Sequence, residues 1–283
     1  MLRVFRRRLQ RLYGSPREFL RVGLELGAAK GLGFKYGAKP PAVSVVITVR
    51  NRKGVRLKNT LKTLLCQSMP REWYEVVVVD FGGNDGLREW LSAIDPGLRC
   101  VYCPEKGPFN EARAKNIGIR QARAEIVCCT NADILFDKNF MDLVYLAARP
   151  RKRVLVECNR FNIGQGDVER SGENLPAEFM DLIRRRKAWM TLWARGDCQA
   201  FRKEFVAELG GYDEDFLGWG YLDSDLEQRC ERAGWSLAMI NAFTSIAHQG
   251  HEGPADEEGN RGLAAEKKGL DPVRNRGREW GKL

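Results

Sequence analysis

This chain of 283 residues lacks several features that mark common protein classes. No apolar run approaches the roughly 18–20 residues that span a bilayer, and the first residues, MLRVFRRRLQRLYG, lack the apolar core of a signal peptide. There is no GxGxxG after the first predicted strand and no GxxxxGKS/T anywhere, so neither dinucleotide-binding nor P-loop chemistry is indicated. We therefore expect a globular, cytoplasmic protein without either nucleotide-binding loop.

The eight cysteines would form a disulfide framework in a small secreted domain, but this chain is long and carries no signal sequence. We expect them to be reduced and mostly buried. The segment CVYC at 100–103 has the spacing of a metal site, yet no second CxxC accompanies it. A strand that carries two thiols is therefore favoured over a zinc site.

The positive charge is concentrated at the two ends. Residues 1–22 carry seven arginines and one glutamate (+6), and residues 261–283 carry seven basic and three acidic residues (+4). Because the total is +10, the residues between them balance at zero. This argues against nucleic-acid binding, which needs a basic stripe across the folded body, and suits basic ends that lie against an anionic membrane surface.

The first basic segment also carries apolar residues at helical spacing, which are Leu2, Phe5, Leu9 and Leu12. Arginines fill the positions between them, as in an amphipathic helix that lies in a membrane interface. The same stripe could instead pack on the body of the protein. Both interpretations stay open, and the first predicts a peripheral position on the inner face of the membrane.

Strand and helix patterns alternate four times after Pro41. We predict strands at 43–49, 74–80, 98–103 and 124–136 and helices at 55–67, 87–94 and 109–122. This order predicts an α/β fold with a mainly parallel central sheet and helices on both faces.

The rest of the chain is less regular. A strand is expected in VLVECNRF (154–161), and a helix or lid in 178–193. Residues 252–283 are rich in glycine and charge, so we expect them to be extended or mobile.

Polar residues end three of the predicted strands, where open α/β sheets bind their ligands. Thr48 is the last residue but one of the first strand, Asp80 ends the second, and Asp133 lies near the end of the fourth. Each acid could merely cap the turn that follows it. A function is indicated because several such residues converge on one crevice.

The motifs together resemble those of family 2-type glycosyltransferases of the GT-A fold, from about Ser44 to His251. The resemblance rests on VVVVDFGGNDG, ARAKNIGIRQA and TNADILF, and on the later block LGGYDEDFLGWGYLDSDLEQRC. The last block is similar to the Gly-Trp-Gly block of galactosyltransferases. It implies a GT-A domain at 41–252, between a basic amphipathic extension (1–40) and a basic tail (253–283).

In such enzymes an acid just after Gly-Trp-Gly removes the proton from the acceptor hydroxyl, and here that acid is Asp223. A carboxylate in the first turn of a helix is held ionised by the helix N-terminus. Leu222 stands where relatives often carry a glutamate, which removes any acceptor contact of that residue. Asp225 and Glu227 are expected to be structural, facing solvent or pairing with Arg229.

The metal motif of the family, Asp-x-Asp, reads Asn131-Ala132-Asp133 here. These three residues are implied to line the donor site, and Asp133 to bind Mn²⁺ or Mg²⁺, which prefer hard oxygen ligands. The chain has two histidines, and His251 matches the late histidine ligand of galactosyltransferases, with His248 as a further candidate. Alternatively, one histidine merely hydrogen-bonds in a loop.

The resemblance also implies the remaining donor-binding residues. Thr48 and Arg50 lie where the fold cradles the nucleotide, and Asp80 where an acid accepts the uracil N–H. Arg113 is implied to face the diphosphate. Trp219 is expected to wall the sugar pocket, with core packing as its alternative.

The resulting hypothesis is an inverting, metal-dependent hexosyl- or N-acetylhexosaminyltransferase. It would use a UDP-sugar and a glycan or lipid-linked saccharide acceptor at the cytoplasmic face of the membrane. The alternative is a catalytically weak or inactive protein that binds nucleotide-sugars or glycans, which the amide of Asn131 would suit.

Overall fold

The computed structural model describes residues 24, 36, 39–185, 187–191, 196–252 and 258–283. The predicted amphipathic helix at the N-terminus lies outside the described residues. Among the residues that are described, no helix is long and apolar enough to cross a membrane.

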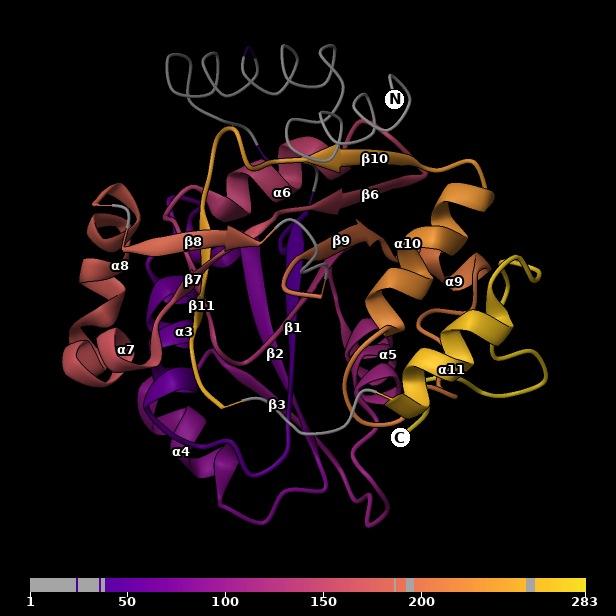
Figure 1. Ribbon diagram of the computed structural model, residues 1–283, viewed down its shortest axis with the longest axis horizontal. Helices are drawn as coiled ribbons and strands as arrows, with labels where there is room; N and C mark the ends of the chain where they lie inside the picture. Colours follow the sequence, from indigo (N-terminus) through magenta and orange to yellow (C-terminus); the bar gives the residue numbers. More distant parts are fainter. Residues whose placement is uncertain (1–23, 25–35, 37–38, 186, 192–195, 253–257) are drawn as a thin grey trace.

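A seven-stranded sheet forms the centre of the molecule (Figure 1). Its strands run in the order β10-β6-β9-β4-β1-β2-β3, and β9 alone is antiparallel to both of its neighbours. The strands are β1 (Val43–Val49), β2 (Tyr74–Phe81), β3 (Arg99–Cys103), β4 (Ile126–Thr130), β6 (Val154–Glu157), β9 (Gln199–Arg202) and β10 (Ser236–Met239). Strands β1 and β2 are buried along their whole length, as expected for the centre of a parallel sheet.

Helices cover both faces of this sheet, which confirms the predicted fold class. The first face packs against α3 (Val55–Leu65), α4 (Leu87–Ile94) and α6 (Phe140–Ala148). The second packs against α5 (Glu111–Gln121), α9 (Lys203–Glu208) and α10 (Leu222–Arg232). Helix α5 approaches β1 so closely that a Cβ on Gly118 would lie 2.2 Å from Cγ1 of Val46. A short 3₁₀ turn, Arg71–Trp73, leads into β2.

A second sheet of four strands lies beside the first, in the order β5-β11-β7-β8. Its strands are β5 (Ile134–Phe136), β11 (Ile246–Gln249), β7 (Arg160–Ile163) and β8 (Ala188–Thr191). Helices α7 (Gln165–Ser171) and α8 (Leu175–Arg184), with the 3₁₀ turn Gly172–Asn174 between them, cover one face through an apolar cluster.

This second sheet corrects three predictions. The strand predicted at 124–136 is broken after Thr130, and its second half pairs with β11 in the other sheet. The strand predicted at 154–161 likewise divides into β6 and β7. The described part of the segment at 178–193 is not a single helix, since α8 is followed by the edge strand β8.

The expectation that 252–283 is extended or mobile is wrong for the described part. Helix α11 (Glu258–Lys267) lies beside α10 (Figure 1), and the residues after it are tied to the loop that precedes α10. Nζ of Lys267 lies 2.6 Å from Oδ2 of Asp213 and from Oδ2 of Asp215, and NH1 of Arg278 lies 2.6 Å from Oδ1 of Asp215. Acids close in space but distant in sequence therefore neutralise part of the basic tail.

The cysteines are all free, as predicted, and six of the eight are buried. Cys100 and Cys103 both lie on β3, in agreement with the strand interpretation of CVYC. Over the described part of the chain, the groups with metal-ligand spacing do not include them.

Candidate active site

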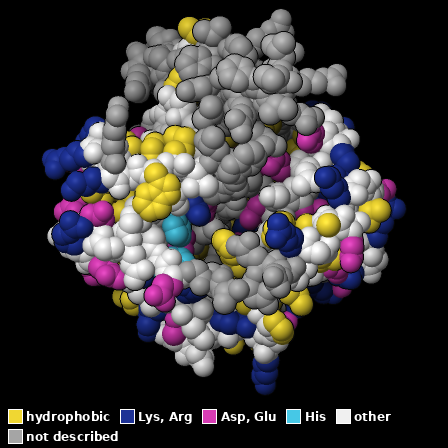
Figure 2. All heavy atoms as spheres, in the orientation of Figure 1, with side chains coloured by type: hydrophobic (Ala, Val, Ile, Leu, Met, Phe, Trp, Pro, Cys, Tyr) yellow, Lys and Arg dark blue, Asp and Glu magenta, His cyan; other side chains and the backbone are white. Residues whose placement is uncertain are grey.

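One cluster of metal-type ligands forms where the two sheets meet. Asp133 follows the break after β4, His248 lies in β11, and His251 follows that strand. Oδ2 of Asp133 lies 3.0 Å from Nε2 of His251 and 3.8 Å from Nε2 of His248. The N–H of Gln249 donates to the Asp133 carbonyl at 2.9 Å, which fixes the two segments against each other. Figure 2 shows histidine side chains (cyan) in a hollow of this face.

The hydrogen bonds of this cluster fit a divalent cation. Nδ1 of His251 lies 2.6 Å from the Glu252 carbonyl and must carry a proton to donate to it, so the lone pair of Nε2 faces Asp133. Two acceptor atoms 3.0 Å apart need a positive group between them. A proton serves, and the hydrogen bond to Asp133 accordingly raises the pKa of His251. A metal ion serves equally.

Two further properties of the cluster support the same fit. Oδ1 of Asp133 is buried and has no hydrogen-bond partner, so it is free to bind a cation. Burial lowers the pKa of His248 to about 4, which leaves this imidazole neutral and able to act as a ligand at neutral pH. The residues present, one carboxylate and two imidazoles, suit Mn²⁺ better than Mg²⁺, which prefers oxygen ligands alone.

The predicted base, Asp223, lies in the first turn of α10 and is joined to a buried lysine. Nζ of Lys115 lies 2.8 Å from Oδ1 of Asp223 and 2.9 Å from Oε1 of Glu111. Burial alone would lower the pKa of Lys115, but the two carboxylates outweigh it and raise that pKa above its ordinary value. No local pattern in the sequence predicts that this lysine, which lies in α5, pairs with Asp223.

The second oxygen of Asp223 faces a glycine. A Cβ on Gly196 would lie 2.2 Å from Oδ2 of Asp223, so only a residue without a side chain fits there. The main-chain carbonyl of Asp223 accepts a hydrogen bond from the side chain of Gln199 at 3.0 Å. Asp223 is thus held by contacts from β9, α5 and the segment before β9.

Sequence reasoning missed Asp197, a buried acid beside the metal motif. Burial raises its pKa to about 6, although the charge of Arg160, whose NH1 lies 2.9 Å from Oδ2, works against this. The amide of Asn131 donates to Oδ1 of Asp197 at 3.0 Å. An aspartate at 131 would oppose two carboxylates at this distance, which explains the amide in the motif. The only sequence signal was an acid next to the glycine in RGDC.

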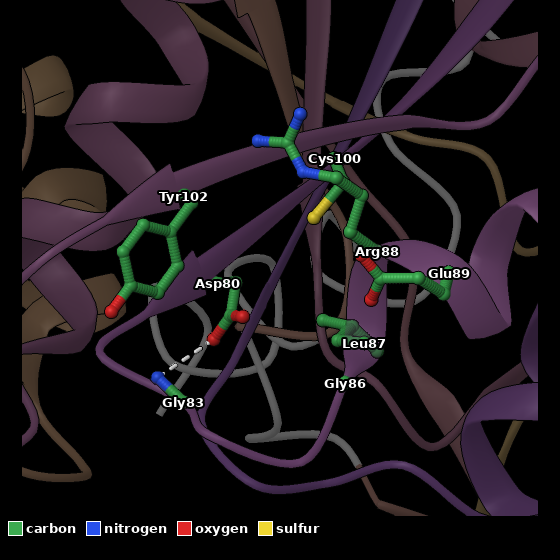
Figure 3. Close-up of a pocket in the computed structure, with 8 residues that line it drawn as sticks. All are labelled: Asp80, Gly83, Gly86, Leu87, Arg88, Glu89, Cys100 and Tyr102. Carbon is green, nitrogen blue, oxygen red and sulfur yellow. Dashed lines mark hydrogen bonds between the residues drawn. The ribbon is translucent and has the colours of Figure 1, made fainter.

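Asp80 lines a cavity of about 220 Å³ at the ends of β2 and β3 (Figure 3). Its Oδ1 accepts a hydrogen bond from the N–H of Gly83 at 2.9 Å, so Asp80 caps the turn and faces the cavity at once. Burial raises the pKa of Asp80. The cavity is lined by Asp80, Gly83, Gly86, Leu87, Arg88, Glu89, Cys100 and Tyr102.

The two arginines expected at the nucleotide, Arg50 and Arg113, both contact the loop that follows β3. Arg50 donates to the carbonyls of Gly107 and Glu105 at 2.7 and 3.1 Å, and to that of Phe81. NH1 of Arg113 lies 2.6 Å from Oε2 of Glu105. A contact between Arg113 and a diphosphate would require this ion pair to open.

Thr48 and Ala132 occupy the strand ends as expected, but their surroundings differ. Thr48 is buried near the end of β1. The carbonyl of Ala132 accepts a hydrogen bond from Thr60 at 3.0 Å, and its side chain packs against the core of the first face. Ala132 therefore contributes to the position of its neighbours Asn131 and Asp133 in the motif.

Trp219 is 41% exposed, which excludes core packing for this side chain. Its turn is held by Asn260 of α11, whose side-chain amide donates to the carbonyls of Leu217, Trp219 and Gly220 at 2.7, 3.0 and 3.2 Å. The tail thus positions the Gly-Trp-Gly block.

Oδ2 of Asp225 lies 2.6 Å from Nε of Arg229, which confirms the predicted pairing.

Comparison with known proteins gives the family. The profile described as glycosyl transferase family 2 matches residues 44–210, and that described as the N-terminal domain of galactosyltransferase matches residues 186–252. Validoxylamine A glucosyltransferase of Streptomyces hygroscopicus subsp. jinggangensis is 29% identical over 228 residues, or 70% of this chain and 53% of that protein. Chondroitin synthase of Escherichia coli is 23% identical over 258 residues, or 80% of this chain and 37% of that protein. The chain therefore spans about half of these relatives or less.

Solved structures share the fold. A mannosyltransferase from Pyrobaculum calidifontis, in complex with GDP-Man and Mn²⁺, superposes with a TM-score of 0.54 and 23% identity over 87% of this chain and 68% of its own. GalNAc-T7 with UDP, GalNAc and Mn²⁺ gives a TM-score of 0.56 and 17% identity over 75% of this chain and 44% of its own. Since the family profile covers more than half of the sequence and the fold is that of GT-A enzymes, the chain belongs to glycosyl transferase family 2.

Proposed function

We propose that this protein transfers a hexose or N-acetylhexosamine from a UDP-sugar to a saccharide or lipid-linked saccharide, with inversion at the anomeric carbon. The observation that carries the proposal is the cluster of Asp133, His248 and His251, in which Oδ1 of Asp133 is buried and has no hydrogen-bond partner. Family membership supports it, as do the solved neighbours that contain Mn²⁺ with either UDP or a GDP-sugar.

The metal would be held by Asp133 and His251, with His248 beside them. A divalent cation supplies positive charge to the leaving diphosphate and so favours departure of the nucleotide. Asp133 suits this place because hydrogen bonding to His251 and the nearby histidines lower its pKa, despite the opposing effect of burial.

Asp223 acts as the general base of the proposed reaction. Lys115 holds Oδ1, and Oδ2 is left to accept the proton of the acceptor hydroxyl. When Asp223 becomes protonated, Glu111 still compensates the buried ammonium of Lys115. One base, a stabilised leaving group and correct positioning are sufficient for a single in-line displacement, and no covalent intermediate is needed.

Asp80 is proposed to select the nucleobase. Its carboxylate lines the cavity beside β3 and can accept the imide N–H of uracil. Guanine also presents N–H donors, so the preference for UDP over GDP must be measured. Nucleotide release from UDP- and GDP-linked hexoses and N-acetylhexosamines, with Mn²⁺ present, tests it directly. Faster release from the GDP-linked sugars would refute the UDP assignment.

The roles of Asp223 and the metal can be separated by two substitutions. Asp223→Asn should lose about 10²–10⁴ in transfer rate and keep nearly unchanged UDP affinity, because the amide retains the shape without the basicity. Retention of more than about a tenth of the rate would show that Asp223 is not the base. Asp133→Ala should abolish the part of UDP affinity that depends on Mn²⁺, and His251→Ala should weaken it. Equal UDP affinity of the wild type with and without Mn²⁺ in calorimetry argues against the metal site.

The second candidate is a protein that binds nucleotide-sugars or glycans without turning them over, and the amide of Asn131 motivates it. The hydrogen bond from Asn131 to Asp197 gives this amide a structural reason. Binding of UDP with Mn²⁺, combined with no nucleotide release from any donor, would favour this candidate.

A further inference from the structure

An aromatic side chain, Trp189, lies on the same face of the second, four-stranded sheet (the small sheet) as His248 of the metal cluster. In the register of that sheet His248 of β11 pairs with Asn162 of β7, and Asn162 pairs with Trp189 of β8. Directly paired residues project from the same face, and neighbouring strands lie about 4.8 Å apart. The Cα of Trp189 is thus about 10 Å from that of His248, along one row.

The opposite face of this sheet is already covered. Phe161 and Ile163, which alternate with Asn162 along β7, pack in the apolar cluster beneath α7 and α8. Trp189 projects away from those helices and is 60% exposed, more than Trp219 at 41%. A solitary exposed apolar residue needs no explanation, but a large indole in the row of a candidate metal ligand does.

Polar groups accompany the indole on the same face. The amide of Asn162 donates to the Trp189 carbonyl at 3.2 Å and to Oγ1 of Thr191 at 2.5 Å. These bonds fix β8 at the sheet edge, and the hydroxyl of Thr191 keeps its own hydrogen to donate. An aromatic face beside fixed hydroxyl and amide groups is the chemistry that recognises a sugar ring, whose C–H face meets the negative face of the ring system.

The nucleotide does not account for this surface. The cavity beside Asp80 is lined by residues of β2, β3, α4 and the turn before α4, and by none of the small sheet. We propose that Trp189 is a platform for the saccharide acceptor, on which a pyranose ring stacks beside the metal cluster. This assignment rests on the proposed function, because an acceptor has meaning only for a transferase.

The test uses the full chain labelled with 5-fluorotryptophan. The ¹⁹F resonance of Trp189 is assigned by its loss in Trp189→Phe. Methyl β-D-glucopyranoside, methyl β-D-galactopyranoside, methyl α-D-mannopyranoside and lactose are then titrated with UDP and Mn²⁺ present. We expect saturable movement of the Trp189 resonance with at least one of them. A Trp189 resonance that stays in place in every titration overturns the proposal.

Variants separate stacking from folding. Trp189→Ala should weaken binding of the responsive saccharide about tenfold, which corresponds to about 1.4 kcal/mol, and Trp189→Phe should retain most of it. Leu270→Ala, which removes another exposed apolar side chain, should change nothing. Metal-dependent UDP affinity and donor hydrolysis should be the same in all variants. Loss of either in Trp189→Ala would mean that Trp189 serves the donor site or the fold, and would overturn the acceptor assignment.

The same experiments distinguish this inference from the proposed function. If saccharides move the Trp189 resonance but no nucleotide-sugar is turned over, Trp189 binds saccharide without serving as an acceptor platform, and the transferase proposal fails. If donors are hydrolysed and Trp189 does not respond, the transferase proposal stands and the platform fails. Pelleting of the protein with neutral vesicles through Trp189, without any saccharide response, would make this residue a membrane contact instead.

Discussion

Replacement of Lys115 by methionine removes the cation that Asp223 and Glu111 share among the described residues. Lys115 is fully buried, the side chain of Glu111 is 5% exposed and that of Asp223 is 17% exposed. Methionine fills a similar volume, so the main effect is to leave two carboxylates together in a poorly solvated place. Removal of one partner from a buried ion pair costs about 3–5 kcal/mol. This is a large part of the roughly 5–15 kcal/mol that stabilises a typical domain.

The loss in Lys115→Met should depend on pH in a defined direction. Burial already raises the pKa of Glu111, and loss of the ammonium must raise it further. A group with a raised pKa in the folded state binds its proton more tightly there, so the folded variant gains stability as the pH falls through that pKa. The difference in unfolding free energy between wild type and variant should be largest near neutral pH and smaller in acid.

Denaturant unfolding of both proteins from about pH 5 to about pH 8 measures this difference. Glu111→Gln, combined with Lys115→Met, removes one of the two buried carboxylates that have lost their cation. It should restore part of the stability, with a coupling of about 1–3 kcal/mol between the two sites. A loss below about 1 kcal/mol that does not vary with pH would refute the reasoning, because an exposed pair behaves in this way and a buried one does not. Transfer activity should fall in both variants, since Asp223 loses the group that holds Oδ1.

Three further outcomes are expected. Asn131→Asp should destabilise the fold by about 1–3 kcal/mol without tightening Mn²⁺ binding, because the new carboxylate faces Asp197; tighter binding in calorimetry would contradict this. Gly118→Ala should cost about 1–3 kcal/mol in denaturant unfolding, since a Cβ would lie 2.2 Å from Cγ1 of Val46; an unchanged midpoint would show that α5 can move away. The full chain should sediment with anionic vesicles in a salt-dependent way, at about 1 kcal/mol per arginine in contact, and a chain that starts at Lys39 should stay in the supernatant; equal sedimentation of both excludes a membrane role for the basic amphipathic extension.

Local sequence pattern was sufficient for much of the fold. The unbroken β-branched runs at 43–49 and 74–80 have no stable place except the centre of a parallel sheet, and the structure puts them there. The periodic helices at 55–65 and 87–94 form close to the predicted bounds. A strand that is short or has one exposed face carries a weaker signal. The break after Thr130 was therefore missed, because β5 is defined by pairing with β11 more than a hundred residues later.

The same distinction between local pattern and tertiary contact applies to the candidate site. Motif order and residue type were enough to nominate Asp223, Asp133 and His251, and the tertiary structure brings the last two within 3.0 Å. Sequence could not show that Lys115 holds Asp223. Nor could it show that the tail folds onto the loop before α10.

These contacts join residues far apart in the chain, and their energies depend on burial, which no local pattern encodes. In the sequence alone, a lysine in a predicted helix is expected to be a solvent-exposed charge. The fold buries Lys115, and a buried ammonium must be compensated by carboxylates, here those of Glu111 and Asp223.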